Sequence, residues 1–201
     1  MNIYTHELYK KVYSCSRYSD FLSKILDFII NDKKLQSLLS FINKNEFVSS
    51  EEISKFFNNK KIYFNNKYSC DEWNDFLSKY SFKKNYNMFF HDIVGHITLK
   101  NNVTPKGEIL ATAGMCGFSF ELGKYYFVNA ILIFSLGYRL FDDTRSDYSD
   151  ISKYIEDIDM AYKNGLKLRK FLNFDEKLLQ DFSIEEYLFQ NCHKLKRFKF
   201  E

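Results

Sequence analysis

The sequence predicts an all-α protein, and three observations support that prediction. The chain contains one proline, Pro105, and seven glycines in 201 residues, so few residues interrupt helices. Apolar residues recur at helical spacing in several segments, and no period-two alternation typical of strands persists for long. Capping boxes, in which a serine is followed three residues later by a glutamate, precede several apolar runs. We expect a single domain over residues 1–201.

The N-terminal part, about residues 1–85, is expected to begin with a helical hairpin. Apolar residues follow the helical period from Phe21 to Ile29 and again from Leu35 to Ile42. Two further helix starts are predicted at Ser49 and Ser69, where capping boxes occur.

The second part, about residues 87–190, contains three further predicted helices. The segment from Tyr125 to Leu140 is apolar nearly all round but is shorter and more interrupted than the roughly 20 residues that cross a membrane. We expect a central buried helix there, and a wall of an apolar ligand tunnel is a second interpretation. A long helix is predicted from about Ser149 to Phe171, and a short closing helix after the capping box at Ser183.

The charge balance argues against a dedicated nucleic-acid binder. The formal net charge is +3, and no basic stripe dominates the chain. The most basic segment is the tail from His193 to Phe200. It has two interpretations, a solvated terminus or a basic-aromatic patch that contacts an anionic membrane surface.

The cysteines indicate a reducing compartment. Cys15, Cys70, Cys116 and Cys192 are scattered without CxxC spacing, which favours free thiols over disulfides or a zinc knuckle. The first residues, MNIYTHELYKK, lack the apolar core of an export signal. We expect a cytoplasmic or matrix-like location, not a secreted protein.

The run from Met88 to Ile97 contains the residues most suited to chemistry. His91, Asp92 and His96 lie within six residues of one another in an otherwise apolar stretch, and two of the four histidines of the chain are among them. Imidazole and carboxylate groups are ligands for zinc and other divalent first-row metals. The alternative is a pair of buried histidines that hydrogen bond within the core. We predict a divalent metal site.

The spacing of these residues sets a geometric condition. At about 100° per residue, Asp92 and His96 share a helix face, whereas His91 and His96 diverge by about 140°. Both histidines can ligate one ion only if the helix contains a π-bulge or ends between them, and Gly95 would ease such a distortion. A regular helix would leave His91 outside the ligand set.

Glu108 is predicted as a further ligand. It stands twelve residues after His96, at the start of a new apolar run, and the residues from Lys100 to Gly107 are expected to form a loop. That loop can fold the next helix back and direct Glu108 toward the first helix. Glu108 can equally be a first-turn glutamate that the helix dipole favours.

This chain resembles the coenzyme Q (ubiquinone) biosynthesis protein 4 family, which is defined by an HDxxH motif followed by eleven residues and a glutamate. His91 and Asp92 match the opening pair, and His96 and Glu108 match the rest, although three residues instead of two separate Asp92 from His96. The segment from Ala161 to Arg169 is similar to the family's AYxxGxxA segment.

The resemblance implies a helical fold with a divalent metal, usually zinc, beside an apolar groove for a polyprenyl chain. It implies His91, Asp92, His96 and Glu108 as metal ligands, with iron as the alternative metal. It further implies a prenylated hydroxybenzoate-type substrate, either for removal of the ring carboxylate at C1 or for organisation of a biosynthetic complex. Implied partners are a polyprenyl aromatic lipid, other quinone-biosynthesis proteins, further copies of the chain and the surface of the inner membrane, but no nucleic acid.

Three other interpretations compete. The run HDIVGH is similar to the iron-binding HDxxGH segment of the pterin-dependent aromatic amino acid hydroxylases, but no acidic residue for a third ligand occurs from Leu122 to Phe141. An HD-type phosphohydrolase needs an upstream histidine, and the nearest is His6. A lipid-binding or scaffolding protein without catalysis is the non-enzymatic alternative.

Overall fold

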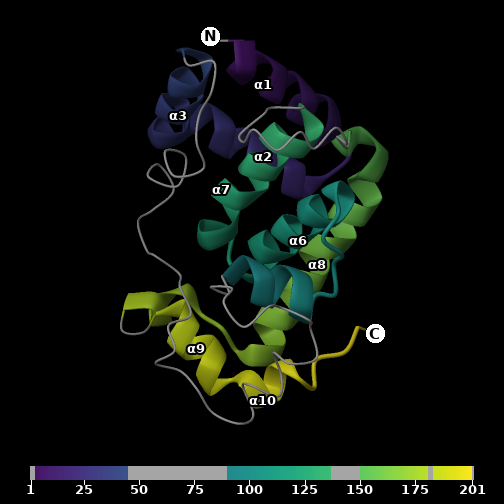
Figure 1. Cartoon of the computed structure of the whole chain (residues 1–201), viewed down its shortest axis with the longest axis vertical. Coiled ribbons are helices and arrows are strands. Elements are labelled where there is room, and N and C mark those ends of the chain that lie inside the picture. Colours follow the sequence, from purple (N-terminus) through teal and green to yellow (C-terminus); the bar gives the residue numbers. More distant parts are fainter. Residues whose placement is uncertain (1–2, 45–89, 137–149, 181–182, 201) are drawn as a thin grey trace.

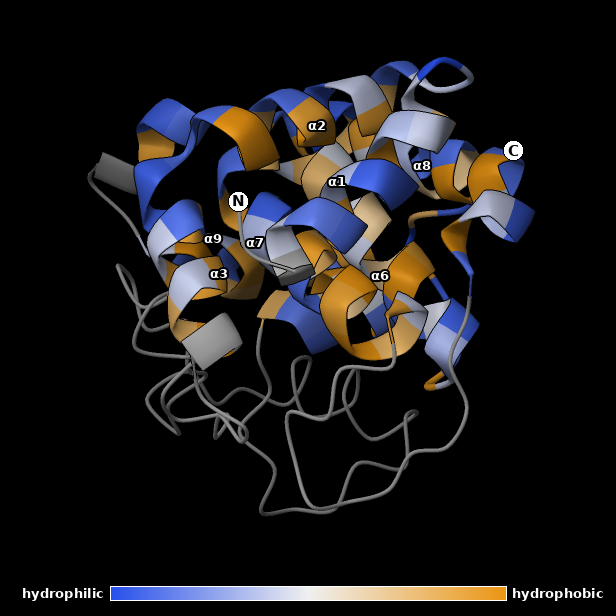
Figure 2. Ribbon diagram, turned by 90° about the horizontal axis from the view of Figure 1, so that it is seen from above, coloured by the Kyte–Doolittle hydropathy of each residue, from blue (hydrophilic) through white to orange (hydrophobic). Residues whose placement is uncertain are grey.

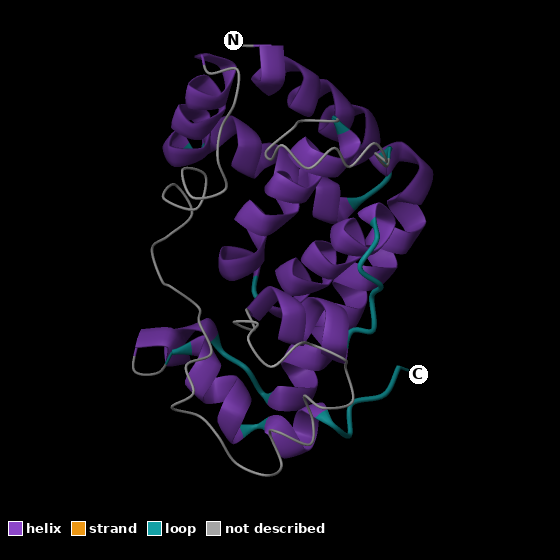
Figure 3. Ribbon diagram, in the orientation of Figure 1, coloured by secondary structure: helices purple, strands orange, loops and turns teal. Residues whose placement is uncertain are grey.

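The computed structural model describes residues 3–44, 90–136, 150–180 and 183–200, and every regular element in these ranges is a helix (Figure 3). This confirms the predicted all-α class. The helix starts predicted at Ser49 and Ser69 lie outside the described residues.

The N-terminal helices occupy one end of the long axis (Figure 1). They are α1 (Ile3–Ser16), α2 (Asp20–Asn31) and α3 (Lys33–Lys44). The hydroxyl of Ser19 accepts a hydrogen bond from the backbone N–H of Leu22 and so fixes the start of α2. Asp32 separates α2 from α3, and its carboxylate accepts from the N–H of Leu35 at 2.7 Å. Both helices predicted for the hairpin are therefore present.

The middle of the chain contains two π-helical segments among its helices. They are η1 (His91–Thr98), α6 (Pro105–Phe118), α7 (Phe120–Ala130) and η2 (Ile131–Ser135), where η1 and η2 are π-helical. α7 begins earlier than the expected Tyr125 because the Ser119 hydroxyl caps it, accepting from the N–H of Leu122. α7 is buried on one side only, because Phe127 is buried whereas Tyr126 is half-buried.

The C-terminal elements continue the chain to the opposite end of the molecule (Figure 1). They are η3 (Ile151–Tyr154), α8 (Ile155–Leu172), η4 (Glu176–Gln180), α9 (Ile184–Gln190) and α10 (Cys192–Leu195). The long helix predicted to Phe171 is confirmed, except that its first turn is the 3₁₀-helix η3. Asn173 ends α8 in the left-handed region, with φ of 56°. The predicted cap at Ser183 is also confirmed, because its hydroxyl accepts from the N–H of Glu186.

Buried apolar side chains form two clusters on either side of α6, whose ribbon is mostly hydrophobic (Figure 2). One cluster joins α1–α3 to α7 and η2. The other packs η1 against the C-terminal halves of α6 and α8 and against α9. Its aromatic centre is Phe118, whose ring lies 5.8 Å from that of Phe90 and stacks at 4.5 Å on Phe174. This second cluster supports the helix that carries both histidines.

Glycines allow α6 and α8 to cross with their backbones in close approach. A Cβ atom at Gly165 would lie 1.9 Å from the carbonyl oxygen of Gly114, and one at Gly117 would lie 2.0 Å from that of Tyr162. Any side chain at Gly117 or Gly165 would therefore push the helices apart. Because Glu108 lies on α6, this crossing helps to fix its position.

None of the helices in the described ranges has the length and apolar character that a membrane span requires. Among the described cysteines, Cys15, Cys116 and Cys192 are buried and form no disulfide with one another. Burial raises the pKa of Cys116 well above its usual value.

Candidate metal centre

The HDIVGH run forms the π-helix η1, which satisfies the geometric condition set by its histidine spacing. The N–H of Leu99 donates to the carbonyl of Val94 at 3.1 Å, and the hydroxyl of Thr98 donates to the carbonyl of Ile93 at 2.7 Å. Hydrogen bonds between residues five apart make the helical turn wider than in an α-helix. Side chains that are five residues apart therefore project from the same side of the helix. The rings of His91 and His96 are accordingly 4.6 Å apart between centroids.

Glu108 lies in the first turn of α6, as expected, but the loop before it is shorter than predicted. Residues 105–107 belong to the helix and not to the loop. Pro105 occupies the first helical position, where its missing N–H costs nothing. The hydroxyl of Thr104 caps the helix by accepting from the N–H of Gly107 at 3.0 Å.

The structure brings all four predicted residues together. Glu108 contacts both histidines, with 3.0 Å from Oε2 to Nε2 of His91 and 3.4 Å from Oε1 to Nε2 of His96. Asp92 lies on the other side of the first ring, with its Oδ1 3.2 Å from Nδ1 of His91. When one ligand atom is taken from each of His91, Asp92 and His96, the three atoms all lie within 4.8 Å of one another.

Electrostatics couple His91 to the two carboxylates. Burial by itself would lower the pKa of His91, but the hydrogen bonds to Asp92 and Glu108 outweigh it and raise that pKa to about 9. Burial would raise the pKa of Glu108, yet its close contacts with the imidazoles of His91 and His96 lower it to about 2. At neutral pH the metal-free protein therefore has a His91 imidazolium paired with an ionised Glu108.

Asn101 holds His96 in place, a role that the sequence did not reveal. The Nδ1 atom of His96 lies 2.8 Å from the backbone oxygen of Asn101, so this nitrogen carries the proton that is donated to the carbonyl. The side-chain amide of Asn101 donates to the carbonyl of Gly95 at 2.9 Å. The chain can fold back in this way because Lys100 adopts the left-handed conformation, with φ of 56°.

The second nitrogen of His96 has no such partner. Its Nε2 atom is buried and has no hydrogen-bond partner among the described residues, and Oε1 of Glu108 lies 3.4 Å from it. Buried polar atoms are rarely left in this state. Because Nδ1 is bonded to the Asn101 carbonyl, Nε2 is the nitrogen on the side of Glu108 that is left to ligate a metal, and a backbone carbonyl on the other ring nitrogen is typical of metal-ligating histidines.

The chemical types of the three converging groups fit a divalent ion. Metal–ligand bonds of about 2.0–2.1 Å in a tetrahedral site separate neighbouring ligand atoms by about 3.3 Å. Glu108 places Oε2 at 3.0 Å from His91 and Oε1 at 3.4 Å from His96, so each of its two oxygens lies at about that distance from one imidazole. Two histidines and one carboxylate with room for further ligands are typical of catalytic zinc and non-haem iron sites. The residues present therefore fit the expected metal.

α7 borders this centre with an aromatic side chain that the sequence did not single out. The Tyr126 ring lies nearly parallel to that of His91, at 6.0 Å and 11°. Asn129 lies three residues later and so on the same side of α7. Its Oδ1 atom is buried and has no hydrogen-bond partner within the described residues. The only acidic residue on α7, Glu121, is exposed and pairs with Lys124, so α7 supplies no ligand.

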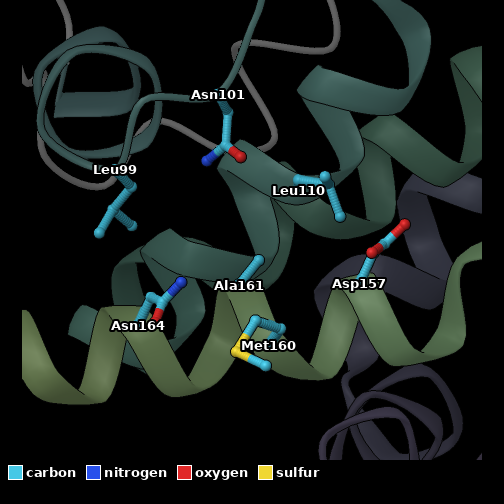
Figure 4. Close-up of a pocket in the computed structure, with 7 residues that line it drawn as sticks. All are labelled: Leu99, Asn101, Leu110, Asp157, Met160, Ala161 and Asn164. Carbon is cyan, nitrogen blue, oxygen red and sulfur yellow. The ribbon is translucent and has the colours of Figure 1, made fainter. Parts of the chain in front are cut away.

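A pocket of about 140 Å³ lies behind the loop that carries Asn101 (Figure 4). α8 forms one wall, and the loop and α6 form the other; the lining residues are Leu99, Asn101, Leu110, Asp157, Met160, Ala161 and Asn164. Leu110 and Glu108 are two residues apart on α6 and so point to opposite sides of that helix. The pocket is therefore separated by α6 from the four candidate ligands.

Comparisons of the chain with protein-family models, with curated proteins and with solved structures give no match.

Proposed function

We propose that this protein binds a divalent metal ion between η1 and α6 through Nε2 of His91, Nε2 of His96 and the carboxylate of Glu108. Zinc is the first candidate and iron the alternative. The observation that carries the proposal is the buried Nε2 atom of His96, which has no hydrogen-bond partner in the described part of the chain and lies beside two other ligand-type atoms.

Asp92, which the sequence predicted as a ligand, has a different contact. Its carboxylate lies 3.2 Å from Nδ1 of His91, on the side of the ring away from Glu108. A carboxylate in that position fixes the orientation of a ligating histidine and increases its basicity. We assign this orienting role to Asp92, and its proximity to the histidines also allows it to join as a fourth ligand.

The proposed substrate class is a hydroxylated aromatic ring with a polyprenyl tail, as the resemblance to the quinone-biosynthesis family implies. A bound divalent ion supplies Lewis acidity toward the phenol and carboxylate oxygens of such a ring. Tyr126 is parallel to the His91 ring and offers a flat apolar surface for an aromatic ligand. The Oδ1 atom of Asn129 offers an acceptor for a hydroxyl group on the same side of α7.

The proposed reaction is oxidative removal of the ring carboxylate. The carbon–carboxylate bond breaks, carbon dioxide leaves, and a hydroxyl group takes its place on the ring. Dioxygen is the two-electron oxidant; when water supplies the hydroxyl oxygen, dioxygen ends as hydrogen peroxide. A scaffold that holds the same lipid for other quinone-biosynthesis proteins requires the binding site but no turnover.

Metal analysis of the purified protein tests the site itself. Wild-type protein should hold about one zinc or iron ion per chain, whereas His96→Ala and Glu108→Ala should lose it. Matched controls are His193→Ala and Glu121→Ala, which remove an exposed histidine and an exposed glutamate. Unchanged metal content in both site variants would refute the proposal.

Substrate assays then separate enzyme from scaffold. Metal-loaded protein is incubated with a prenylated hydroxybenzoate in aerobic buffer, and the product is followed by mass spectrometry together with carbon dioxide release. Turnover that disappears in Glu108→Ala supports the enzyme. Retention of an isoprenoid lipid without turnover supports the scaffold, and absence of both would exclude this substrate class.

A further inference from the structure

The outer face of α8 exposes large apolar side chains. Met160, Leu166 and Phe171 are 57%, 41% and 44% exposed, and they are three of only seven large hydrophobic residues that are exposed in the described part of the chain. At about 100° per residue, Leu166 lies at one edge of the exposed side of α8, and Met160 and Phe171 lie at the other edge, away from the buried residues Ile158, Ala161, Gly165, Leu168 and Leu172. Exposed large apolar residues along both edges of one helix side indicate an interaction surface.

Cations are interleaved with these apolar side chains. Lys163, Lys167 and Lys170 lie on the same stripe and are all exposed. None of the three forms an ion pair with another described residue. The nearest acid along the helix, Asp159, accepts a hydrogen bond from the hydroxyl of Ser19 at 2.5 Å.

The C-terminal tail brings further positive charge to the same end of α8 (Figure 1). The ring of Phe198 is buried and packs on Phe171 at 5.6 Å, and Phe200 packs on Phe198 at 5.5 Å. These contacts anchor the tail while Arg197 and Lys199 stay exposed. The tail is thus ordered against the body of the protein, unlike a free solvated terminus.

The charge of this region exceeds that of the whole chain. Residues 160–174 contain four lysine or arginine residues, residues 191–200 contain four more, and neither segment contains an acid, whereas the chain as a whole has a net charge of +3. The first turn of α8 carries Glu156 and Asp157, so the positive charge is confined to its second half. Such segregation directs a docking partner to one end of the molecule.

We infer that this region is a docking surface for a membrane that contains anionic lipids. We call it the α8–tail face and define it as Met160, Lys163, Leu166, Lys167, Lys170, Phe171, Arg197 and Lys199. The lysines would lie at the level of the lipid phosphates, and the apolar side chains between them would enter the boundary with the acyl chains. This combination favours a bilayer over a nucleic acid, because nucleic-acid grooves select cations and stacking aromatics but not exposed Leu and Met side chains. The inference is independent of the metal centre.

Vesicle co-sedimentation of the full chain tests the inference. The protein should sediment with vesicles of phosphatidylcholine and phosphatidylglycerol at low salt, should be released at high salt, and should not bind phosphatidylcholine alone. Each neutralised cation should weaken binding by about fivefold. The triple variant Lys163→Glu/Lys167→Glu/Lys170→Glu should therefore bind at least about a hundredfold more weakly.

A control variant separates the face from overall charge. Lys10→Glu/Lys33→Glu/Lys153→Glu changes the net charge by the same amount on exposed residues of α1, α3 and η3 and should retain most of the binding. The double variant Leu166→Ser/Phe171→Ser should bind vesicles more weakly than the wild type, and its remaining binding should still require anionic lipid. Far-ultraviolet circular dichroism and urea unfolding, measured on every variant, should match the wild type and so report that each one folds.

Several results would overturn the inference. It is wrong if the protein fails to bind anionic vesicles at low salt, or if both triple variants lose binding equally. It is also wrong if binding does not depend on anionic lipid. Tighter binding of single-stranded oligonucleotides than of vesicles, lost in the α8 triple variant, would assign the face to nucleic acid instead.

Discussion

The separation between η1 and α6 should control metal binding, and Gly95→Ala tests this directly. Gly95 faces Ala111 of α6, and an added Cβ atom would lie 2.9 Å from the Ala111 Cβ and 3.1 Å from its carbonyl oxygen. Ordinary contact begins near 3.4 Å, so η1 must move away from α6 by about half an ångström. That shift acts between the helix with both histidines and the helix with Glu108.

The expected loss can be estimated from the tolerance of metal sites. Metal–ligand distances vary by only about 0.2 Å, so a displacement of half an ångström should weaken metal binding by about 10- to 100-fold. Overpacking should also lower the free energy of unfolding by about 1–3 kcal/mol. Affinity is measured by competition with a chromophoric chelator, and stability by urea unfolding in the presence of a chelator.

The double variant Gly95→Ala/Ala111→Gly provides the rescue. It removes the contact between the two Cβ atoms, so metal affinity should return toward the wild-type value. Stability should recover less, because glycine within α6 costs about 1 kcal/mol and the carbonyl contact remains. If Gly95→Ala binds metal as tightly as wild type, or if the double variant stays as weak as the single one, the separation of η1 and α6 does not set the site.

Three further predictions follow from the site and from α9. Metal affinity should rise about tenfold per pH unit up to pH about 9 and then level off, because His91, with its pKa of about 9, must release its proton to bind; a flat profile in chelator competition would contradict this. Asp92→Asn should weaken metal binding by about 10- to 100-fold, whereas complete loss of metal would make Asp92 a ligand. Burial raises the pKa of Glu185 from 4.5 to about 7, so the folded protein keeps its proton more tightly than the unfolded chain does, and stability should fall as pH rises from 4.5 through 7. Glu185→Gln should remove that loss, worth up to about 3 kcal/mol at pH 8, as measured by urea unfolding at both ends of the range.

Most helices could be predicted from local patterns because their causes are local. The apolar spacing in α2, α3 and α8 and the cap at Ser183 act within one or two turns of the chain. The sequence predicts the start of α6 at Glu108, three residues later than the observed Pro105, because proline and glycine are typical of loops. Thr104 followed by Pro105 is a local signal for a helix start, and it would have corrected the boundary.

The roles of Asn101 and Tyr126 could not be predicted, because they depend on contacts between elements. Asn101 reaches His96 and Gly95 only because the chain reverses at Lys100. Lys100 adopts the left-handed region, which glycine usually occupies and lysine rarely does, so the sequence does not predict this reversal. Tyr126 lies beside His91 because of how α7 packs, and the sequence shows it only as one of fifteen tyrosines. The absence of a hydrogen-bond partner for Nε2 of His96 among the described residues likewise depends on which side chains the fold places around it.

The π-helical form of η1 allows His91 and His96, which are five residues apart, to meet Glu108 together. In an α-helix, a spacing of five residues would turn His91 and His96 about 140° apart, and only one of them could face Glu108. π-helical turns are rare, so η1 needs compensation from its surroundings. Gly95 lets α6 approach, and the hydroxyl of Thr98 and the amide of Asn101 donate to the carbonyls of Ile93 and Gly95. Because these contacts support the widened turns of η1, both histidines meet Glu108 despite their spacing of five residues.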